Sequence, residues 1–355
     1  MPAPHVPRGR GAISNATGRF ERLAREAVHD GWDLDEDLPP LRTEVATDAS
    51  RSVIARNQSP DVPFDRSLNP YRGCEHGCVY CFARPTHAQL GLSPGLDFET
   101  RLVAKPEAPR LLAAELSRPR YRPDTLAIGT NTDPYQPVEK RLKIMRGVLE
   151  VLRDFRHPVS VVTKGSLVTR DLDLLAELAA EGLTRVGISV TSLDPKLSRA
   201  MEPRAAAPAR RLAAVEALAK AGVPVHVLVA PVVPALNDHE IERILQSARD
   251  AGARSARWIL LRLPLEVKDL FREWLAEQRP DRAARVMKLV RETRGGRDYD
   301  PEWGRRMTGE GPYAALIARR FAVAAARLGL DRELPPLRRD LFRVPPRPGD
   351  QLSLF

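Results

Sequence analysis

Cysteine is scarce in this sequence: the 355 residues include only three, and all three lie within eight positions. Cys74, Cys78 and Cys81 are too few and too close together to form the cross-links of a disulfide-stabilised domain. A tight, odd-numbered group of cysteines is typical of proteins that bind a metal ion or an iron–sulfur cluster. The lack of other cysteines therefore excludes a disulfide framework and directs attention to one loop.

Long hydrophobic runs are also missing. No stretch of about 18 apolar residues offers a membrane span, and residues 1–14 contain no apolar segment of the kind that directs export. Hydrophobic residues make up 43% and charged residues 29%, which is typical of a globular enzyme. We therefore expect a cytoplasmic protein without a membrane partner.

Lysine is rare as well, with eight residues against 48 arginines, although the net charge is +10. The arginine excess has two interpretations, which composition alone leaves open. It reflects either the base composition of a GC-rich genome or a surface that binds the phosphates of DNA or RNA.

The chain divides into four predicted regions. Residues 1–62 are rich in Pro, Arg, Asp and Ser and are expected to form a partly disordered N-terminal arm. In residues 63–278, short β-branched runs alternate with amphipathic stretches, which is the pattern of βα units around a parallel sheet. Residues 279–334 are expected to form an α-rich C-terminal cap, and residues 335–355 a Pro- and Arg-rich tail.

The βα pattern predicts about six repeats, which is fewer than the eight of a closed barrel. We therefore predict an α/β fold with a partial (βα)6 barrel that is similar to a TIM barrel. One uninterrupted helix is predicted over residues 138–155. Besides a short strand before Cys74, strands are predicted at residues 101–104, 125–129, 159–163, 185–192, 225–230 and 256–261.

Reactive groups of such barrels lie at the carboxyl ends of the strands. This rule selects a small set of polar residues at the ends of predicted strands. They are the three cysteines, Thr130, Asn131, Thr132, Asp133, Lys164, Ser189 and Thr191. We expect one mouth of the barrel to collect all of them.

The cysteine loop has the spacing C-x3-C-x2-C, and Tyr80 precedes the third cysteine. Three thiolates can hold three corners of a 4Fe–4S cluster and leave the fourth iron open to another ligand. Gly73 and Gly77 allow backbone amides to approach the cluster sulfides. The alternative is a zinc site with His76 or His87 as the fourth ligand, although structural zinc is more typical of small domains that need metal to fold.

The loop and the βα array that follows it resemble the radical S-adenosylmethionine (radical SAM) superfamily, and within it the branch similar to spore photoproduct lyase, often labelled DNA repair photolyase. The resemblance covers about residues 63–275, and the cysteine spacing with Tyr80 is its most specific part. It implies that the open iron chelates the amino and carboxylate groups of SAM. One electron from the cluster then breaks the bond from sulfur to C5′, and the products are methionine and a 5′-deoxyadenosyl radical that abstracts hydrogen from a substrate.

The resemblance also implies which residues meet the adenine and the amino group of SAM. Tyr80 and Phe82 are expected to lie against the adenine or the cluster loop. Thr130, Asn131 and Asp133 end the second barrel strand and are expected near the amino group. Asp133 before a proline also has a plain interpretation as a turn residue.

Further residues are implied for the carboxylate and the ribose. Lys164 resembles the lysine that pairs with the methionine carboxylate, and Arg204 is a second candidate for that role. Ser189 and Thr191 are expected at the ribose or the carboxylate. Residues 229–231 and 258–260 are expected to pack on the adenine through backbone and apolar contacts. The plain alternatives are a surface position for Lys164 and a local hydrogen bond for Ser189.

A residue that completes repair in the photolyase branch is missing here. Spore photoproduct lyase uses a further cysteine as hydrogen donor, whereas all three cysteines of this chain are assigned to the cluster. Unless a tyrosine such as Tyr135 takes that role, reversal of a thymine dimer by the same route is not expected. Since a shared fold does not transfer a reaction, the substrate and the reaction type, lyase or transferase, stay open.

The sequence ends in Gln351, Leu352, Ser353, Leu354 and Phe355, which resembles the short motif by which bacterial proteins bind the replication sliding clamp. A mobile tail offers its leucines and phenylalanine to apolar pockets, while the glutamine makes directional hydrogen bonds. The alternative is a tail that docks on its own domain.

Three functions are compatible with these observations. The first is a radical SAM enzyme that repairs or modifies DNA or RNA, is recruited by the clamp and is reduced by a donor such as flavodoxin or ferredoxin. The second keeps the radical chemistry but acts on a peptide or a small metabolite. The third is a non-catalytic binding module with a structural metal, tethered to the clamp.

Overall fold

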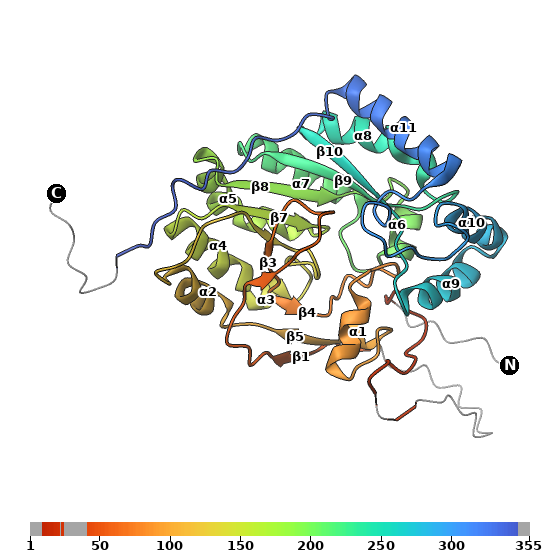
Figure 1. Cartoon of the computed structure of the whole chain (residues 1–355), viewed down its shortest axis with the longest axis horizontal. Coiled ribbons are helices and arrows are strands. Elements are labelled where there is room, and N and C mark those ends of the chain that lie inside the picture. The colour runs from red at the N-terminus through yellow and green to blue at the C-terminus, as the bar shows by residue number, and fades with distance from the viewer. Residues whose placement is uncertain (1–8, 22, 25–40, 347–355) are drawn as a thin grey trace.

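The structure, a computed structural model, describes residues 9–21, 23–24 and 41–346. A seven-stranded sheet with the order β10-β9-β8-β7-β6-β3-β2 forms its centre (Figure 1). Neighbouring strands are parallel except at one edge, where β2 (Ala55–Arg56) pairs antiparallel with β3. The six parallel strands are β3 (Arg66–Leu68), β6 (Leu126–Ile128), β7 (Val159–Thr163), β8 (Thr184–Ser189), β9 (Val225–Val232) and β10 (Ser255–Leu260). Because β2 and β10 are edges of this sheet, the predicted partial barrel is confirmed.

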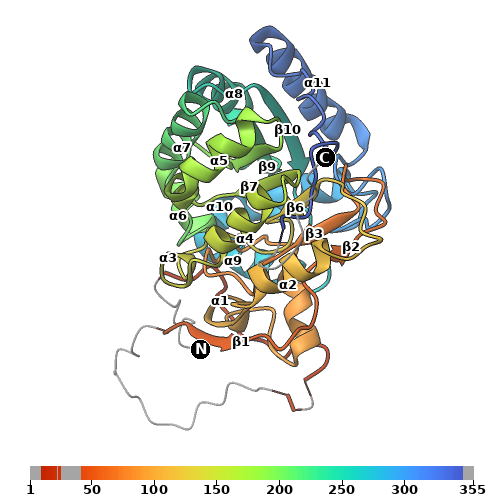
Figure 2. The ribbon, with the colours of Figure 1, turned by 90° about the vertical axis from the view of Figure 1, so that its left-hand side faces the viewer.

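Helices cover the outer face of this sheet (Figure 2). On α4, the buried Val148, Leu149 and Leu152 recur at a spacing that forms one apolar stripe. This stripe joins one large core with the buried valines of the strands, such as Val161 and Val186. The covering helices are α2 (Ala108–Leu116), α4 (Ile144–Asp154), α5 (Leu172–Ala180), α7 (Pro208–Lys220) and α8 (Ile241–Asp250).

The connections between strands contain shorter helices. The prediction of one helix over residues 138–155 is wrong, because Lys143 has a φ of 52° and the left-handed backbone ends α3 before α4 begins. A helix that was not predicted, α6, begins after Asp194, whose side chain accepts a hydrogen bond from the N–H of Lys196. The short elements are η1 (Arg84–Leu90), α1 (Asp97–Thr100), α3 (Glu139–Leu142), η2 (Ser166–Asp171), α6 (Pro195–Met201) and η3 (Asp238–Glu240).

The strand predicted at residues 101–104 forms, but it lies outside the barrel. β5 (Arg101–Ala104) pairs parallel with β1 (Glu44–Thr47) and antiparallel with β4 (Tyr71–Arg72) in a separate three-stranded sheet. Figure 1 shows this sheet beside α1, below the barrel strands. Since β1 and β2 fall within the predicted N-terminal arm, the described part of that arm is built into both sheets.

Three helices follow the last strand: α9 (Val267–Gln278), α10 (Pro280–Glu292) and α11 (Gly311–Leu328). α9 and α10 share a second hydrophobic core with the cysteine loop. This core includes Val79, Leu261 and Phe271. The segment between α10 and α11 returns to the barrel, where the N–H of Leu260 bonds the carbonyl of Met307 at 2.8 Å. In the part of the chain that the structure describes, no helix combines the length and the apolar character needed to cross a membrane.

Candidate active site

The cysteine loop follows β3 and β4 at the carboxyl end of the first barrel strand. Gly73 and Gly77 have φ values of 77° and 68°, a left-handed backbone that glycine adopts without strain. A side chain at Gly73 would meet the carbonyl of Phe98, which already accepts a hydrogen bond from the N–H of Cys74 at 2.9 Å. At Gly77 it would meet the carboxylate of Glu99. Both glycines are therefore needed for the loop to pack tightly on α1.

Cys74 and Cys78 are buried and Cys81 is partly buried, and burial raises the pKa of each thiol, to about 12 for Cys78. Backbone N–H groups face two of the sulfurs. The N–H of Asp133 faces Cys74, and two N–H groups of the following turn face Cys81. Buried thiolates need positive charge and hydrogen-bond donors nearby, and iron–sulfur clusters are held and tuned in this way. The residues present therefore fit a cluster.

A buried ion pair supports the loop from behind. The side chains of Arg84 and Glu99 are completely buried and contact each other at 2.5 Å. Arg84 also donates to the carbonyl of Cys78 at 2.9 Å, and the Glu99 carboxylate accepts from the N–H groups of Gly11 and Ala12 at 2.9 Å each. The described start of the chain is thus attached to the cysteine loop. The Arg84–Glu99 pair was not predicted from the sequence, because nothing in the local pattern links two residues that are 15 positions apart.

Asp133 lies at the centre of a hydrogen-bond network after β6. One carboxylate oxygen accepts from the Tyr135 N–H at 2.9 Å and the Thr163 hydroxyl at 2.6 Å. The other accepts from the Lys164 N–H at 2.7 Å and faces His76 Nδ1 at 3.3 Å. Burial by itself raises the pKa of Asp133, but His76 and these hydrogen bonds outweigh it and lower the pKa to about 2. Asp133 therefore ties the cysteine loop to β6 and β7, and its predicted contact with the amino group of SAM stays a prediction.

Three of the predicted site residues gather around Glu202, which was not predicted. The Tyr80 hydroxyl donates to one carboxylate oxygen of Glu202, and the Thr191 hydroxyl donates to the same oxygen at 2.7 Å. The other oxygen accepts from the buried Arg211. Lys164 Nζ lies 5.8 Å from the centroid of the Tyr80 ring and makes no ion pair with any residue that the structure describes. Burial raises the pKa of Glu202, but Arg211 and Lys164 outweigh it and lower the pKa, so this carboxylate is charged.

Other predicted residues line the same strand ends. The hydroxyls of Ser189 and Thr191 both lie within hydrogen-bond distance of the Ala230 carbonyl, at 3.0 and 3.1 Å. After β6, the structure gives the side chains of Thr130 and Asn131 no hydrogen-bond partner among the residues that it describes. The carboxyl ends of β6, β7 and β8 thus carry the residues that were expected at one mouth of the barrel.

Three predicted residues lie elsewhere or face other groups. Arg204 pairs with Glu75 at 3.1 Å and lines a separate open pocket of about 550 Å³. Phe82 is 43% exposed and lies against Arg262. The ring of Trp258 packs against Phe321 of α11, with centroids 6.3 Å apart, and the packing of residues 258–260 on the adenine stays a prediction.

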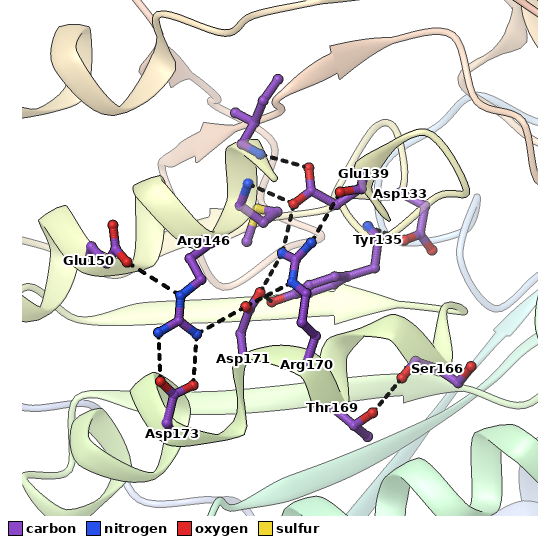
Figure 3. A network of polar contacts seen from close by, with 12 residues as sticks. Asp133, Tyr135, Glu139, Arg146, Glu150, Ser166, Thr169, Arg170, Asp171 and Asp173 are labelled. Atoms are coloured by element: carbon purple, nitrogen blue, oxygen red, sulfur yellow. Dashed lines mark hydrogen bonds and ion pairs between the residues drawn. The ribbon is translucent and has the colours of Figure 1, made fainter. Parts of the chain in front are cut away.

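Tyr135 belongs to a polar network that joins α3, α4, η2 and α5 (Figure 3). Its hydroxyl donates to Asp171 at 3.1 Å, and Arg170 bridges Asp171 and Glu139 at 2.7 and 2.8 Å. Burial and the neighbouring Asp171 raise the pKa of Tyr135 well above its usual range. Because its hydroxyl points toward Asp171, nothing in this arrangement supports Tyr135 as a replacement for a missing cysteine.

The histidines of the zinc alternative have other neighbours. His76 faces Asp133, and His87 packs edge-on against Phe98, with ring centroids 5.5 Å apart. Within the described ranges, no three His, Cys, Asp or Glu residues are grouped so as to hold a single metal ion.

A model of the radical SAM superfamily matches residues 68–248, from the end of β3 into α8, including the cysteine loop. The chain belongs to the radical SAM superfamily. Membership implies a 4Fe–4S cluster and SAM, and this replaces the zinc alternative. It supports the conclusion that the protein is an enzyme.

Relatives of this radical SAM protein occur in bacteria and archaea. It is 41% identical over 242 residues to the uncharacterized protein Rv2578c of Mycobacterium tuberculosis. The aligned region covers 67% of this chain and 71% of the relative. It is 27% identical over 173 residues to the uncharacterized protein MJ0683 of Methanocaldococcus jannaschii. Here the aligned region covers 49% of this chain and 62% of the relative.

Solved structures of spore photoproduct lyase share the fold. One of them, a mutant with bound SAM and dinucleoside spore photoproduct, has a TM-score of 0.56 and 16% sequence identity, covering 80% of this chain and 77% of that chain. At this identity the similarity concerns the fold alone, and it agrees with the partial barrel described above.

Proposed function

We propose that Cys74, Cys78 and Cys81 hold a 4Fe–4S cluster and that the enzyme cleaves SAM reductively. When bound, the cluster supplies one electron to the bond between the sulfur and C5′ of SAM, which yields methionine and a 5′-deoxyadenosyl radical. The single observation that supports this best is the grouping of two buried thiols and one partly buried thiol with backbone N–H groups and the Lys164 ammonium. Lys164 lies close enough to Cys78 and Cys81 to lower the pKa of both thiols against the effect of burial.

The side chains at the strand ends have the chemistry that SAM requires. Lys164 supplies a cation for the methionine carboxylate, and Thr130 and Asn131 supply oxygen acceptors for the amino group. Ser189 and Thr191 offer hydroxyl lone pairs to the ribose, since their hydrogens are used by the Ala230 carbonyl and Glu202. The hydrogen bond from its hydroxyl to Glu202 holds the Tyr80 ring in place next to the Lys164 ammonium.

A cleavage assay tests this proposal. Anaerobically purified protein with dithionite and SAM is expected to form 5′-deoxyadenosine. Replacing Lys164→Ala removes the cation and is expected to weaken SAM binding roughly 10- to 100-fold, while Lys164→Arg retains part of it. The matched control is Lys196→Ala, an exposed lysine on α6. No 5′-deoxyadenosine from the wild type, or equal SAM affinity in Lys164→Ala and wild type, would argue against the assignment.

We propose nucleic acid as the substrate class. The net charge of +10 and the 48 arginines support it, and a solved structure of the same fold carries a dinucleoside lesion. A peptide or a small metabolite is the alternative. Single-stranded DNA, duplex DNA and RNA are compared as additives in the cleavage assay; stimulation of SAM cleavage by one of them supports the proposal, and stimulation by none counts against it. The products then distinguish a lyase from a transferase.

Recruitment by the sliding clamp stays a prediction, because Gln351, Leu352, Leu354 and Phe355 lie outside the described residues. Full-length protein is expected to bind the clamp of its own organism, and Phe355→Ala is expected to lose that binding. Equal binding by both proteins would show that the motif is not used.

A further inference from the structure

Phe82, the residue after the last cysteine, places an exposed aromatic ring next to the proposed cluster. It is 43% exposed, whereas Tyr80 in the same loop is only 7% exposed. The guanidinium carbon of Arg262 lies 4.8 Å from the centroid of the Phe82 ring, within the range of a cation–π interaction. Arg262 follows the end of β10 by two residues, so the pair lies at the carboxyl ends of the barrel strands, where such folds bind substrates.

The charge of Arg262 is not neutralised by a direct ion pair with any acid in the described part of the chain. Its terminal nitrogens reach only the Tyr299 hydroxyl at 3.5 Å and the Met307 sulfur at 3.6 Å, and its buried Nε has no partner. Asp61, an acid near enough to feel the charge of Arg262, is already bonded to Arg306. Arg262 therefore has both positive charge and an unsatisfied donor.

A second cation, Arg294, lies next to Arg262. It is 1% exposed and donates to the carbonyls of Leu261 at 2.6 Å and Arg305 at 3.0 Å, while its Nε has no partner. Burial and the neighbouring charge of Arg262 together lower the pKa of Arg294 to about 10, although Tyr299 and Asp300 oppose this effect. Because Arg294 is buried and its terminal nitrogens are bonded to carbonyls, it does not contact a ligand directly but adds positive potential beside Arg262, which favours an incoming anion.

We infer that Phe82 and Arg262 form a stacking platform for an unpaired base of single-stranded nucleic acid. The inference rests on the proposed function and names the part of the site that holds the substrate. A nucleobase offers a flat π face to the ring and the guanidinium plane, and an adjoining phosphate supplies the negative partner that Arg262 lacks. Trp303 is 56% exposed and lies in the same turn as Met307, whose carbonyl accepts a hydrogen bond from the N–H of Leu260 at the end of β10. Phe82 thus serves the substrate, not the adenine of SAM.

The test is the affinity of the anaerobically purified full chain for a fluorescently labelled single-stranded DNA 12-mer, measured by anisotropy. Phe82→Leu keeps an apolar side chain but removes the π face, and Arg262→Ala removes the cation. Each is expected to weaken binding roughly tenfold or more, because stacking of one base on an aromatic side chain contributes at that level. Phe82→Trp is expected to retain binding.

The matched control is Arg254→Ala. Arg254 is exposed and precedes the same strand, β10, at its opposite end, so the variant loses the same charge far from the platform. It is expected to weaken binding less than twofold at the same ionic strength. Equal losses in Arg262→Ala and Arg254→Ala would show non-specific charge attraction and would overturn the platform.

An abasic 12-mer separates stacking from phosphate contacts. Wild type and Phe82→Leu are expected to bind it equally, because it has no base to stack. A Phe82→Leu variant that binds the normal 12-mer as tightly as wild type contradicts the inference.

Iron content and thermal midpoint are measured for every variant to confirm an intact cluster and fold. These binding results are independent of SAM cleavage, so a wild type that binds DNA by stacking but forms no 5′-deoxyadenosine refutes the proposed chemistry and leaves the platform supported.

Discussion

The Tyr80 hydroxyl donates a hydrogen bond to Glu202, a carboxylate that is 1% exposed and lies 122 residues further along the chain. The same carboxylate is paired with Arg211, which is also 1% exposed. The aromatic residue of the cysteine motif is therefore held by a buried ion pair at the end of α6.

Replacing Glu202→Ala leaves the Arg211 guanidinium buried without its partner. We expect the free energy of unfolding to fall by about 3–5 kcal/mol, as for other broken buried pairs. Glu202→Gln retains an oxygen acceptor for Tyr80 or Arg211 and is expected to lose less. Denaturant unfolding of both variants measures the difference, and a Glu202→Ala protein as stable as wild type would rule out this role.

The Arg84–Glu99 pair behind the cysteine loop gives a second prediction. Arg84→Met or Glu99→Gln alone leaves one buried charge without a partner, and each is expected to cost about 3–5 kcal/mol. The double variant removes both charges and is expected to cost less than the two single losses added together. Unfolding of the two single variants and the double variant completes this cycle. Additive losses would mean that the two side chains act independently.

Asp133 predicts a pH dependence of stability. Its pKa is about 2 in the fold, against about 3.9 in an unfolded chain. Its stabilising effect is therefore fully present above about pH 4 and is lost as the pH falls toward 2; the shift corresponds to about 2–3 kcal/mol. Asp133→Asn is expected to be less stable than wild type by this amount at pH 7, and the gap is expected to narrow below pH 4.

Denaturant unfolding of both proteins at several pH values tests this prediction. The matched control is Asp154→Asn, which removes an exposed acid that pairs with Arg153 at 2.8 Å and is expected to change stability by less than about 1 kcal/mol. A gap between Asp133→Asn and wild type that stays constant from pH 7 to pH 3 would contradict the role assigned to Asp133.

The sequence alone predicted the parts of the site that depend on local patterns. The cysteine spacing is readable within eight residues. Lys164 directly follows β7 and Ser189 is the last residue of β8, and both strands have clear β-branched runs. Glu202 was missed because an acid before a proline at the end of a short helix looks like any surface acid. Its role arises only when α6 brings it under Tyr80.

The same limit applies to the fold. The barrel strands were predicted because each has its own apolar run, whereas the sheet β1-β5-β4 is assembled from segments that are distant in sequence and have no shared period. The break in the helix at Lys143 was not predictable, since lysine has no preference for the left-handed backbone found there.

The proposed chemistry depends most directly on the cluster, and the iron and acid-labile sulfide content of anaerobically purified protein tests it. Wild type is expected to contain about four iron and four sulfide per chain. The variants Cys74→Ala, Cys78→Ala and Cys81→Ala are each expected to lose most of both, together with SAM cleavage. A wild-type protein without iron and sulfide, or a triple variant that retains them, would contradict the assignment of these three cysteines.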